Sequence, residues 1–154
     1  MNALFRFALA ALAASLLAPA AAAQGSGAAL ASQDSNWSGV VIEVTEFRRK
    51  GNTLSVKTRL RNTGAEAVEV DVRYGDVYVL DTAGGKRYDV LRDDKGAVIA
   101  AHLPSWPERW YGTIEPGAAM TLWMKFPAPP ADTTEATLVI GTNAPFEDLP
   151  IEDA

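Results

Sequence analysis

One stretch constrains the fold of this chain more than any other: a strand pattern framed by a Pro-Gly turn and a run of prolines. Pro116 restricts its own backbone and Gly117 accepts a positive φ, so together they suit a type II turn. The side chains that follow alternate between two faces, with Met120, Leu122, Met124 and Phe126 on one and Thr121, Trp123 and Lys125 on the other. This period of two predicts a strand with one buried face. Pro127, Pro129 and Pro130 lack an N–H group and end the strand.

The same alternation recurs along the chain between Gly-rich and Asn-rich turns. In residues 54–61 one face is apolar and the other is largely charged, so that face must contact water and the sheet must be antiparallel. Val77–Leu80 is apolar on both faces and fits either a central strand or one covered by a loop. Arg48 to Asn52 reads as a solvated hairpin tip. The sequence therefore predicts an all-β fold, an Ig-like antiparallel β-sandwich of seven or eight strands.

The N-terminus has the features of a cleaved export signal. Arg6 precedes an apolar run, and Ala21 and Ala23 are small residues at the positions that a cut after Ala23 requires. The apolar run is shorter than the roughly 20 residues that span a bilayer. We expect a signal peptide over residues 1–23, a flexible spacer over 24–36 and the Ig-like domain over 37–154, with a periplasmic or extracellular location.

Charge and cysteine content exclude several kinds of partner and bond. The chain has 14 basic and 19 acidic side chains, a net charge of −5, which becomes −6 when Arg6 leaves with the signal. An acidic surface repels nucleic acid and anionic lipid, so we expect neither nucleic-acid binding nor membrane insertion after signal cleavage. The chain contains no cysteine, so no disulfide can hold the fold together and burial alone must do so.

Several of the turn and strand motifs together resemble a known family. They include Leu60-Arg-Asn-Thr-Gly64, Tyr78-Val-Leu-Asp81, Ile114-Glu-Pro-Gly117 and Pro145-Phe-Glu-Asp148. Over roughly Val40 to Ile151 the chain is similar to bacterial envelope Ig-like domains of the telokin-like extracellular immunoprotective family, and to the N-terminal Ig-like modules of some OmpA-family proteins. The resemblance implies a fold and an envelope location. It implies no catalytic residues, and we expect no wall tethering through an OmpA-type peptidoglycan-binding domain.

The sequence shows no constellation typical of an enzyme or a metal site. His102 is the single histidine, and no serine stands in a Gly-x-Ser-x-Gly context that would make it a nucleophile. Asp93 and Asp94 lie near Gly96, but their spacing does not match a calcium-binding loop. We therefore expect no enzymatic activity, no catalytic residue, no metal site and no cofactor.

The aromatic residues around the proline-rich loop are the candidate binding residues: Trp106, Trp110, Tyr111 and Trp123. Clustered on the surface, they would form a rigid platform for a sugar or a protein. Alternatively the loop folds over the open end of the sandwich and its tryptophans complete the core, which small disulfide-free domains need. The function predicted is a secreted, non-enzymatic interaction or accessory module whose partner is an envelope protein or a glycan. The alternative is a carbohydrate- or peptidoglycan-binding module that uses the aromatic loop.

Overall fold

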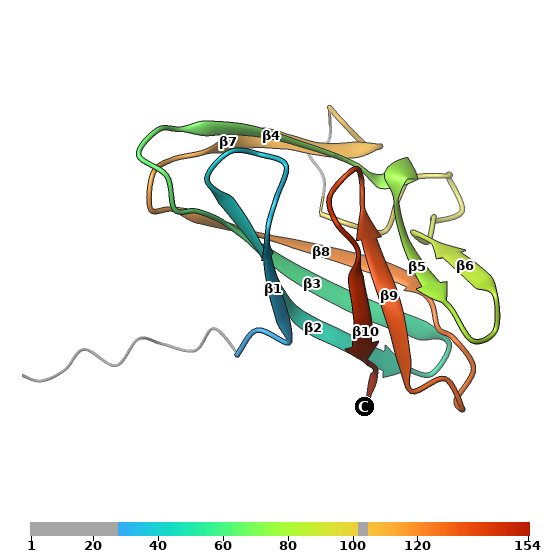
Figure 1. The fold of residues 1–154 in the computed structure, drawn as a ribbon. Coiled ribbons are helices and arrows are strands. Elements are labelled where there is room, and N and C mark those ends of the chain that lie inside the picture. The colour runs from blue at the N-terminus through green and yellow to red at the C-terminus, as the bar shows by residue number, and fades with distance from the viewer. Residues whose placement is uncertain (1–27, 102–104) are drawn as a thin grey trace, which may run out of the picture.

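A computed structural model describes residues 28–101 and 105–154 and shows a β-sandwich, which confirms the predicted fold class (Figure 1). Short segments outside the alternating stretches raise the number of strands in these ranges above the seven or eight predicted. The elements are β1 (Ala31–Asp34), β2 (Val40–Lys50), β3 (Thr53–Asn62), β4 (Val68–Arg73), the 3-10 turn η1 (Tyr74–Asp76), β5 (Val77–Asp81), β6 (Lys86–Asp89), β7 (Arg109–Ile114), β8 (Ala119–Pro127), β9 (Glu135–Ile140), β10 (Phe146–Pro150) and β11 (Glu152–Asp153).

Two main sheets enclose the core. The first has the order β1-β2-β3-β8, with β11 beside β2, and the second has the order β10-β9-β5-β6. Every pairing is antiparallel except the parallel pairing of β11 with β2. The apolar run at Val77–Leu80 is indeed a central strand, because β5 pairs with both β9 and β6. Within the described residues no helix is long and apolar enough to cross a membrane.

β8 has the alternation predicted for it. Leu122, Met124 and Phe126 are almost fully buried, whereas Trp123 between them is 42% exposed. The turn before the strand is closed by a hydrogen bond of 3.0 Å from the Ala118 N–H to the Glu115 carbonyl. Gly117 has a φ of +75°, which is why a glycine is needed at this position of the turn.

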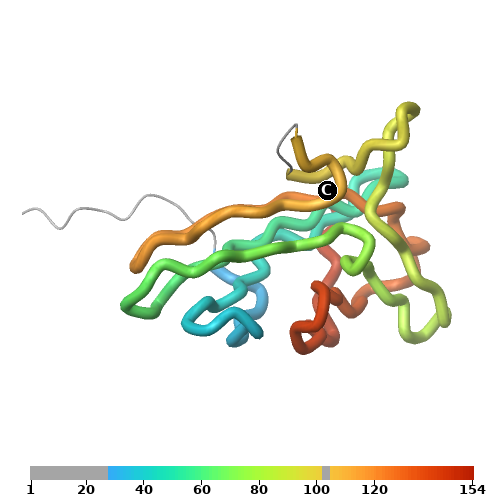
Figure 2. The backbone as a smooth tube through the Cα atoms, turned by 90° about the horizontal axis from the view of Figure 1, so that it is seen from above, coloured from blue at the N-terminus to red at the C-terminus, as the bar shows by residue number. Residues whose placement is uncertain are grey.

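A two-stranded ribbon of β4 and β7 lies over the top of the sandwich in Figure 1, and Figure 2 shows the same ribbon from above. The two strands pair only with each other among the described strands. Their inward side chains Val70, Val72, Trp110 and Ile114 join the hydrophobic core. β7 begins at Arg109, just after Pro107, because proline cannot take part in a regular ladder.

The predicted spacer over residues 24–36 is wrong for its described part. Residues 31–34 form β1, which pairs with β2 from Ala31 opposite Val44 to Asp34 opposite Val41. β1 shows no apolar alternation, because backbone hydrogen bonds along β2 hold it in place and none of its side chains is fully buried. The folded domain therefore starts before Trp37. The predicted signal peptide and residues 24–27 lie outside the described residues.

The predicted hairpin is present with Gly51 at its bend, at a φ of +56°, but the tip predicted over Arg48 to Asn52 is too long. β2 continues to Lys50, and only Gly51 and Asn52 form the turn. A β-bulge between Val44 and Glu46 adds one residue to β2. The extra residue reverses the alternation, so the side chain of Arg49 turns inward and is only 7% exposed.

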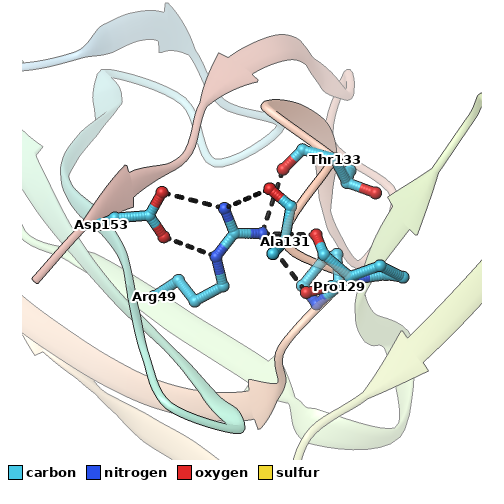
Figure 3. A network of polar contacts seen from close by, with 6 residues as sticks. Arg49, Pro129, Ala131, Thr133 and Asp153 are labelled. Atoms are coloured by element: carbon cyan, nitrogen blue, oxygen red, sulfur yellow. Dashed lines mark hydrogen bonds and ion pairs between the residues drawn. The ribbon is translucent and has the colours of Figure 1, made fainter.

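Figure 3 shows how the buried guanidinium of Arg49 is satisfied. It pairs with both carboxylate oxygens of Asp153 in β11, at 2.6 and 3.0 Å. It also donates to four backbone carbonyls of the connection between β8 and β9, those of Pro129, Pro130, Ala131 and Thr133. Arg49 is therefore a structural link between β2, this connection and the C-terminal strand, and not a free basic patch.

Candidate binding surface

Trp106 and Tyr111 both contact Arg109, which points outward from the β4–β7 ribbon. The guanidinium carbon of Arg109 lies 4.2 Å from the ring centre of Trp106 and 5.6 Å from that of Tyr111. Trp106 is 43% exposed and Tyr111 is 37% exposed. Such stacking of a cation on an aromatic ring is favourable, and more so when the groups are partly desolvated. We call these three residues, with Glu69 and Asp71, the ribbon patch.

The local sequence explains why these three side chains meet. Arg109 and Tyr111 are two residues apart in β7, so both point away from the core. A turn precedes the strand, in which the Arg109 N–H donates to the Trp106 carbonyl over 3.3 Å. Pro107 occupies the second position of this turn, which proline favours, and the turn brings Trp106 back beside Arg109.

Two carboxylates of β4 fix the other side of the ribbon patch. Asp71 lies directly opposite Tyr111 in the strand register. Its Oδ2 accepts from Arg109 over 3.1 Å, and Glu69 Oε1 accepts from the Tyr111 hydroxyl over 3.0 Å. The hydrogen bond to Glu69 and the charge of that carboxylate raise the pKa of Tyr111, so its hydroxyl stays protonated and keeps donating. The patch is thus ordered before any partner arrives.

Trp110, one of the four predicted binding residues, lies in the core and is 7% exposed. It points inward because it stands between Arg109 and Tyr111 in the same strand. Gly112 makes room for its ring, since a Cβ at that position would lie 2.9 Å from the indole. For this residue the core interpretation of the aromatic loop holds, while Trp106 and Tyr111 lie on the surface.

Trp123, the fourth predicted residue, is exposed on a different face. It stands opposite Lys57 on the outer side of the first sheet, where Lys125 donates to Ser55 Oγ over 2.9 Å. Trp123 and Trp110 line the same shallow hollow of about 520 Å³, together with residues 98–101. The structure therefore brings Trp106 and Tyr111 together and leaves Trp123 apart from them.

The sequence reasoning missed Arg109, Glu69 and Asp71 as parts of the surface. A signal was present, because Arg109 alternates with Trp110 and Tyr111 as a strand residue would. His102 lies outside the described residues. Within those residues no group of three or more histidine, cysteine, aspartate and glutamate side chains could hold a metal ion.

Comparisons of the chain with protein-family models, with curated proteins and with solved structures found no match. The resemblance to the telokin-like extracellular immunoprotective family therefore stays a prediction from motifs, and any function must be inferred from the surface itself.

Proposed function

We propose that this chain is an exported, non-enzymatic Ig-like module of the bacterial cell envelope that binds another protein through the ribbon patch. One observation carries the proposal: Trp106 and Tyr111 remain substantially exposed while both contact Arg109. Tryptophan, tyrosine and arginine are the residues most enriched among those that dominate protein–protein binding energy. Here all three are adjacent on one outward face.

The ordering of the ribbon patch favours binding. A flexible side chain loses about 0.5–1.5 kcal/mol of conformational entropy when an interface immobilises it. Arg109 is already paired with Asp71, and Tyr111 with Glu69, so part of this cost is met in the free protein. Partners that cover the rings would also desolvate the cation and strengthen its stacking.

The same geometry argues against a sugar as the main ligand of this surface. A sugar ring stacks on the open face of an aromatic ring, but the guanidinium of Arg109 covers one face of Trp106 at 4.2 Å. Trp110 is buried and Trp123 lies on β8, so two rings remain where a platform of four was predicted. A protein surface, which can contact ring edges and the arginine together, fits this arrangement better.

The test compares the expected mature chain, residues 24–154, with a variant that carries Trp106→Ala and Tyr111→Ala. Each protein is cross-linked in native envelope extract, and the captured proteins and glycans are identified. Trp123→Ala is the matched control, because it removes an exposed tryptophan of similar exposure outside the ribbon patch. We expect the double variant to capture at least about tenfold less of one specific protein, which is equivalent to about 1.4 kcal/mol of binding free energy. The control should capture that protein as wild type does.

Capture that is unchanged in the double variant, or lost equally in the Trp123→Ala control, would contradict the proposal. Specific capture of a glycan fraction would favour the carbohydrate-binding alternative. Circular dichroism and thermal melting accompany each protein, and we expect all three to fold because the replaced side chains are exposed.

A further inference from the structure

A separate pocket is lined by two loops, one from each sheet, together with the end of β4 and η1. Figure 1 shows these loops and η1 at the top of the sandwich. The two loops are residues 35–39, between β1 and β2, and residues 141–145, between β9 and β10. The cavity has a volume of about 230 Å³. Six of the side chains that line it carry its chemistry: Asn36, Trp37, Asp71, Arg73, Asp76 and Thr142. We call it the end pocket.

The walls of the end pocket are held in place by hydrogen bonds between the loops. The backbone N–H of Asn36 donates to the side-chain oxygen of Asn143 over 2.7 Å. The side-chain amide of Asn36 donates to the carbonyl of Thr142 over 2.5 Å. Gly141 donates to the backbone carbonyl of Asp76 over 2.9 Å, which joins the second loop to η1. The pocket is therefore formed in advance, as small-molecule sites usually are.

The lining of the end pocket combines an apolar base with polar groups that can still accept hydrogen bonds. Val72 and Ile140 are buried core residues, and the indole of Trp37 adds an aromatic surface. The carboxylate of Asp76 has no hydrogen bond or ion pair to any described residue. Asp71 Oδ1 is a buried acceptor without a donor among the described residues. A buried acceptor of this kind is costly unless a ligand or water satisfies it.

The charges in and beside the end pocket balance. The carboxylate of Asp71 is paired with Arg109 at 3.1 Å and with Arg73 at 3.5 Å. With Asp76 there are two carboxylates against two guanidinium groups. A charged ligand would be attracted by the groups of opposite charge and repelled by those of like charge, so the two effects would largely cancel. A neutral ligand with many hydroxyl groups can use both, because carboxylates accept hydrogen bonds and guanidinium groups donate them.

We infer that the end pocket binds a single neutral pyranose ring of a glycan. The apolar face of the ring packs on Trp37, while its hydroxyls donate to Asp76 and accept from Arg73. Pockets for drug-sized ligands have volumes of about 300–1,000 Å³. The smaller volume here suits one ring, so the remainder of a glycan would lie outside. The end pocket shares Asp71 with the ribbon patch, but Oδ2 of that carboxylate pairs with Arg109 whereas Oδ1 is the unpartnered oxygen. The inference does not depend on the function proposed for the ribbon patch.

The test titrates the ¹⁵N-labelled mature chain, residues 24–154, with glucose, galactose, mannose, N-acetylglucosamine and a neutral disaccharide of N-acetylglucosamine, followed by NMR. Methylammonium chloride and sodium phosphate serve as cationic and anionic probes. We expect saturable shifts at the Trp37 indole N–H and the backbone amides of Asn36 and Gly141 with at least one sugar. Asp76→Asn should lower the affinity for that sugar by at least tenfold, because an amide is a poorer hydrogen-bond acceptor than a carboxylate. Asp94→Asn, the same change on an exposed turn, should not.

Three results would overturn the inference. The first is an absence of saturable shifts in the end pocket with every sugar tested. The second is a saturable response there to methylammonium or phosphate alone, which would show an ion site. The third is a sugar response confined to Trp106, Tyr111 or Trp123, which would place the glycan on an exposed aromatic surface. Loss of the protein partner in the cross-linking experiment leaves this titration unaffected, so the two proposals fail separately.

Discussion

At the scale of single residues, Thr58 shows an apparent mismatch with its surroundings. Its side chain faces the core from β3 and is fully buried, yet its Oγ1 has no hydrogen-bond partner among the described residues. We expect Thr58→Val to stabilise the protein by about 1 kcal/mol, because valine keeps the shape and removes an unsatisfied polar group. Urea unfolding followed by tryptophan fluorescence measures the change in the free energy of unfolding.

Tyr74→Phe is the contrasting control, because the buried Tyr74 hydroxyl does donate, to the carbonyl of Ala101. Burial raises the pKa of this hydroxyl, so it remains a donor at any ordinary pH. Its removal should cost about 1 kcal/mol. If Thr58→Val is as destabilising as Tyr74→Phe, a water or a rearranged neighbour satisfies Thr58, and our interpretation of its burial is wrong.

Single residues also show what the sequence can predict about the surface. Alternation within one strand is enough to separate Trp110 from Tyr111, once β7 is assigned correctly. The pairing of Asp71 with Arg109 is different, because the two residues are 38 positions apart in sequence and meet only through the register between β4 and β7. No pattern within either strand contains that register. The outward positions of Arg109 and Tyr111 could therefore be predicted, but the pairing of Arg109 with Asp71 could not.

At the scale of elements, alternation predicted β8 and the one-sided strand over residues 54–61, which lies within β3 and buries its apolar face. It failed where an element is held by something other than side-chain burial. β1 is held by its backbone ladder, and the end of β2 is displaced by a bulge. Neither cause leaves a periodic trace in the sequence, so both segments resemble loops when read alone.

The link between β11 and the rest of the fold can be tested at Arg49. We expect Arg49→Gln to destabilise the protein by about 2–3 kcal/mol, because it leaves several backbone carbonyls without their donor and breaks a partly buried ion pair. Hydrogen exchange should speed up at Glu152 and Asp153 as β11 detaches from β2. Urea unfolding and exchange followed by NMR measure both effects.

Arg48→Gln is the matched control for this experiment. Arg48 pairs with Glu152 in the neighbouring position of the same two strands, but its side chain is 50% exposed. An exposed pair contributes at most about 1 kcal/mol, so we expect little change in stability. Equal effects of the two substitutions would contradict the structural role assigned to Arg49.

At the scale of the whole molecule, two carboxylates predict how stability depends on pH. Burial of Glu43 opposes its ionisation, but hydrogen bonds and charges from Arg59 and Arg61 outweigh it, and the net effect lowers the pKa. The hydrogen bond from Arg49 lowers the pKa of Asp153. Both groups therefore bind protons more readily in the unfolded chain. Their contribution to stability is complete above the ordinary carboxyl range and is lost as the pH falls through the lowered values.

Thermal melting at a series of pH values checks this expectation. The melting temperature should be level between pH 7 and about pH 5 and fall below about pH 4. At neutral pH the Glu43→Gln variant should have a lower melting temperature than wild type. Its melting temperature should fall less on acidification, so that the plots of melting temperature against pH for the two proteins converge. Curves that stay parallel down to low pH would show that Glu43 does not contribute to the acid sensitivity.

β1 and β11 pair with the same strand, and this affects how the protein can be immobilised on a surface or fused to another domain. β1 lies along the first half of β2 and β11 along the second, and in Figure 1 both ends of the described chain leave the sandwich at the bottom. The loops over residues 35–39 and 141–145, which line the end pocket, are at the top. A bead, a sensor surface or a fused domain joined to either terminus is therefore on the far side of the molecule, and immobilisation by either end should leave the pocket facing the solution.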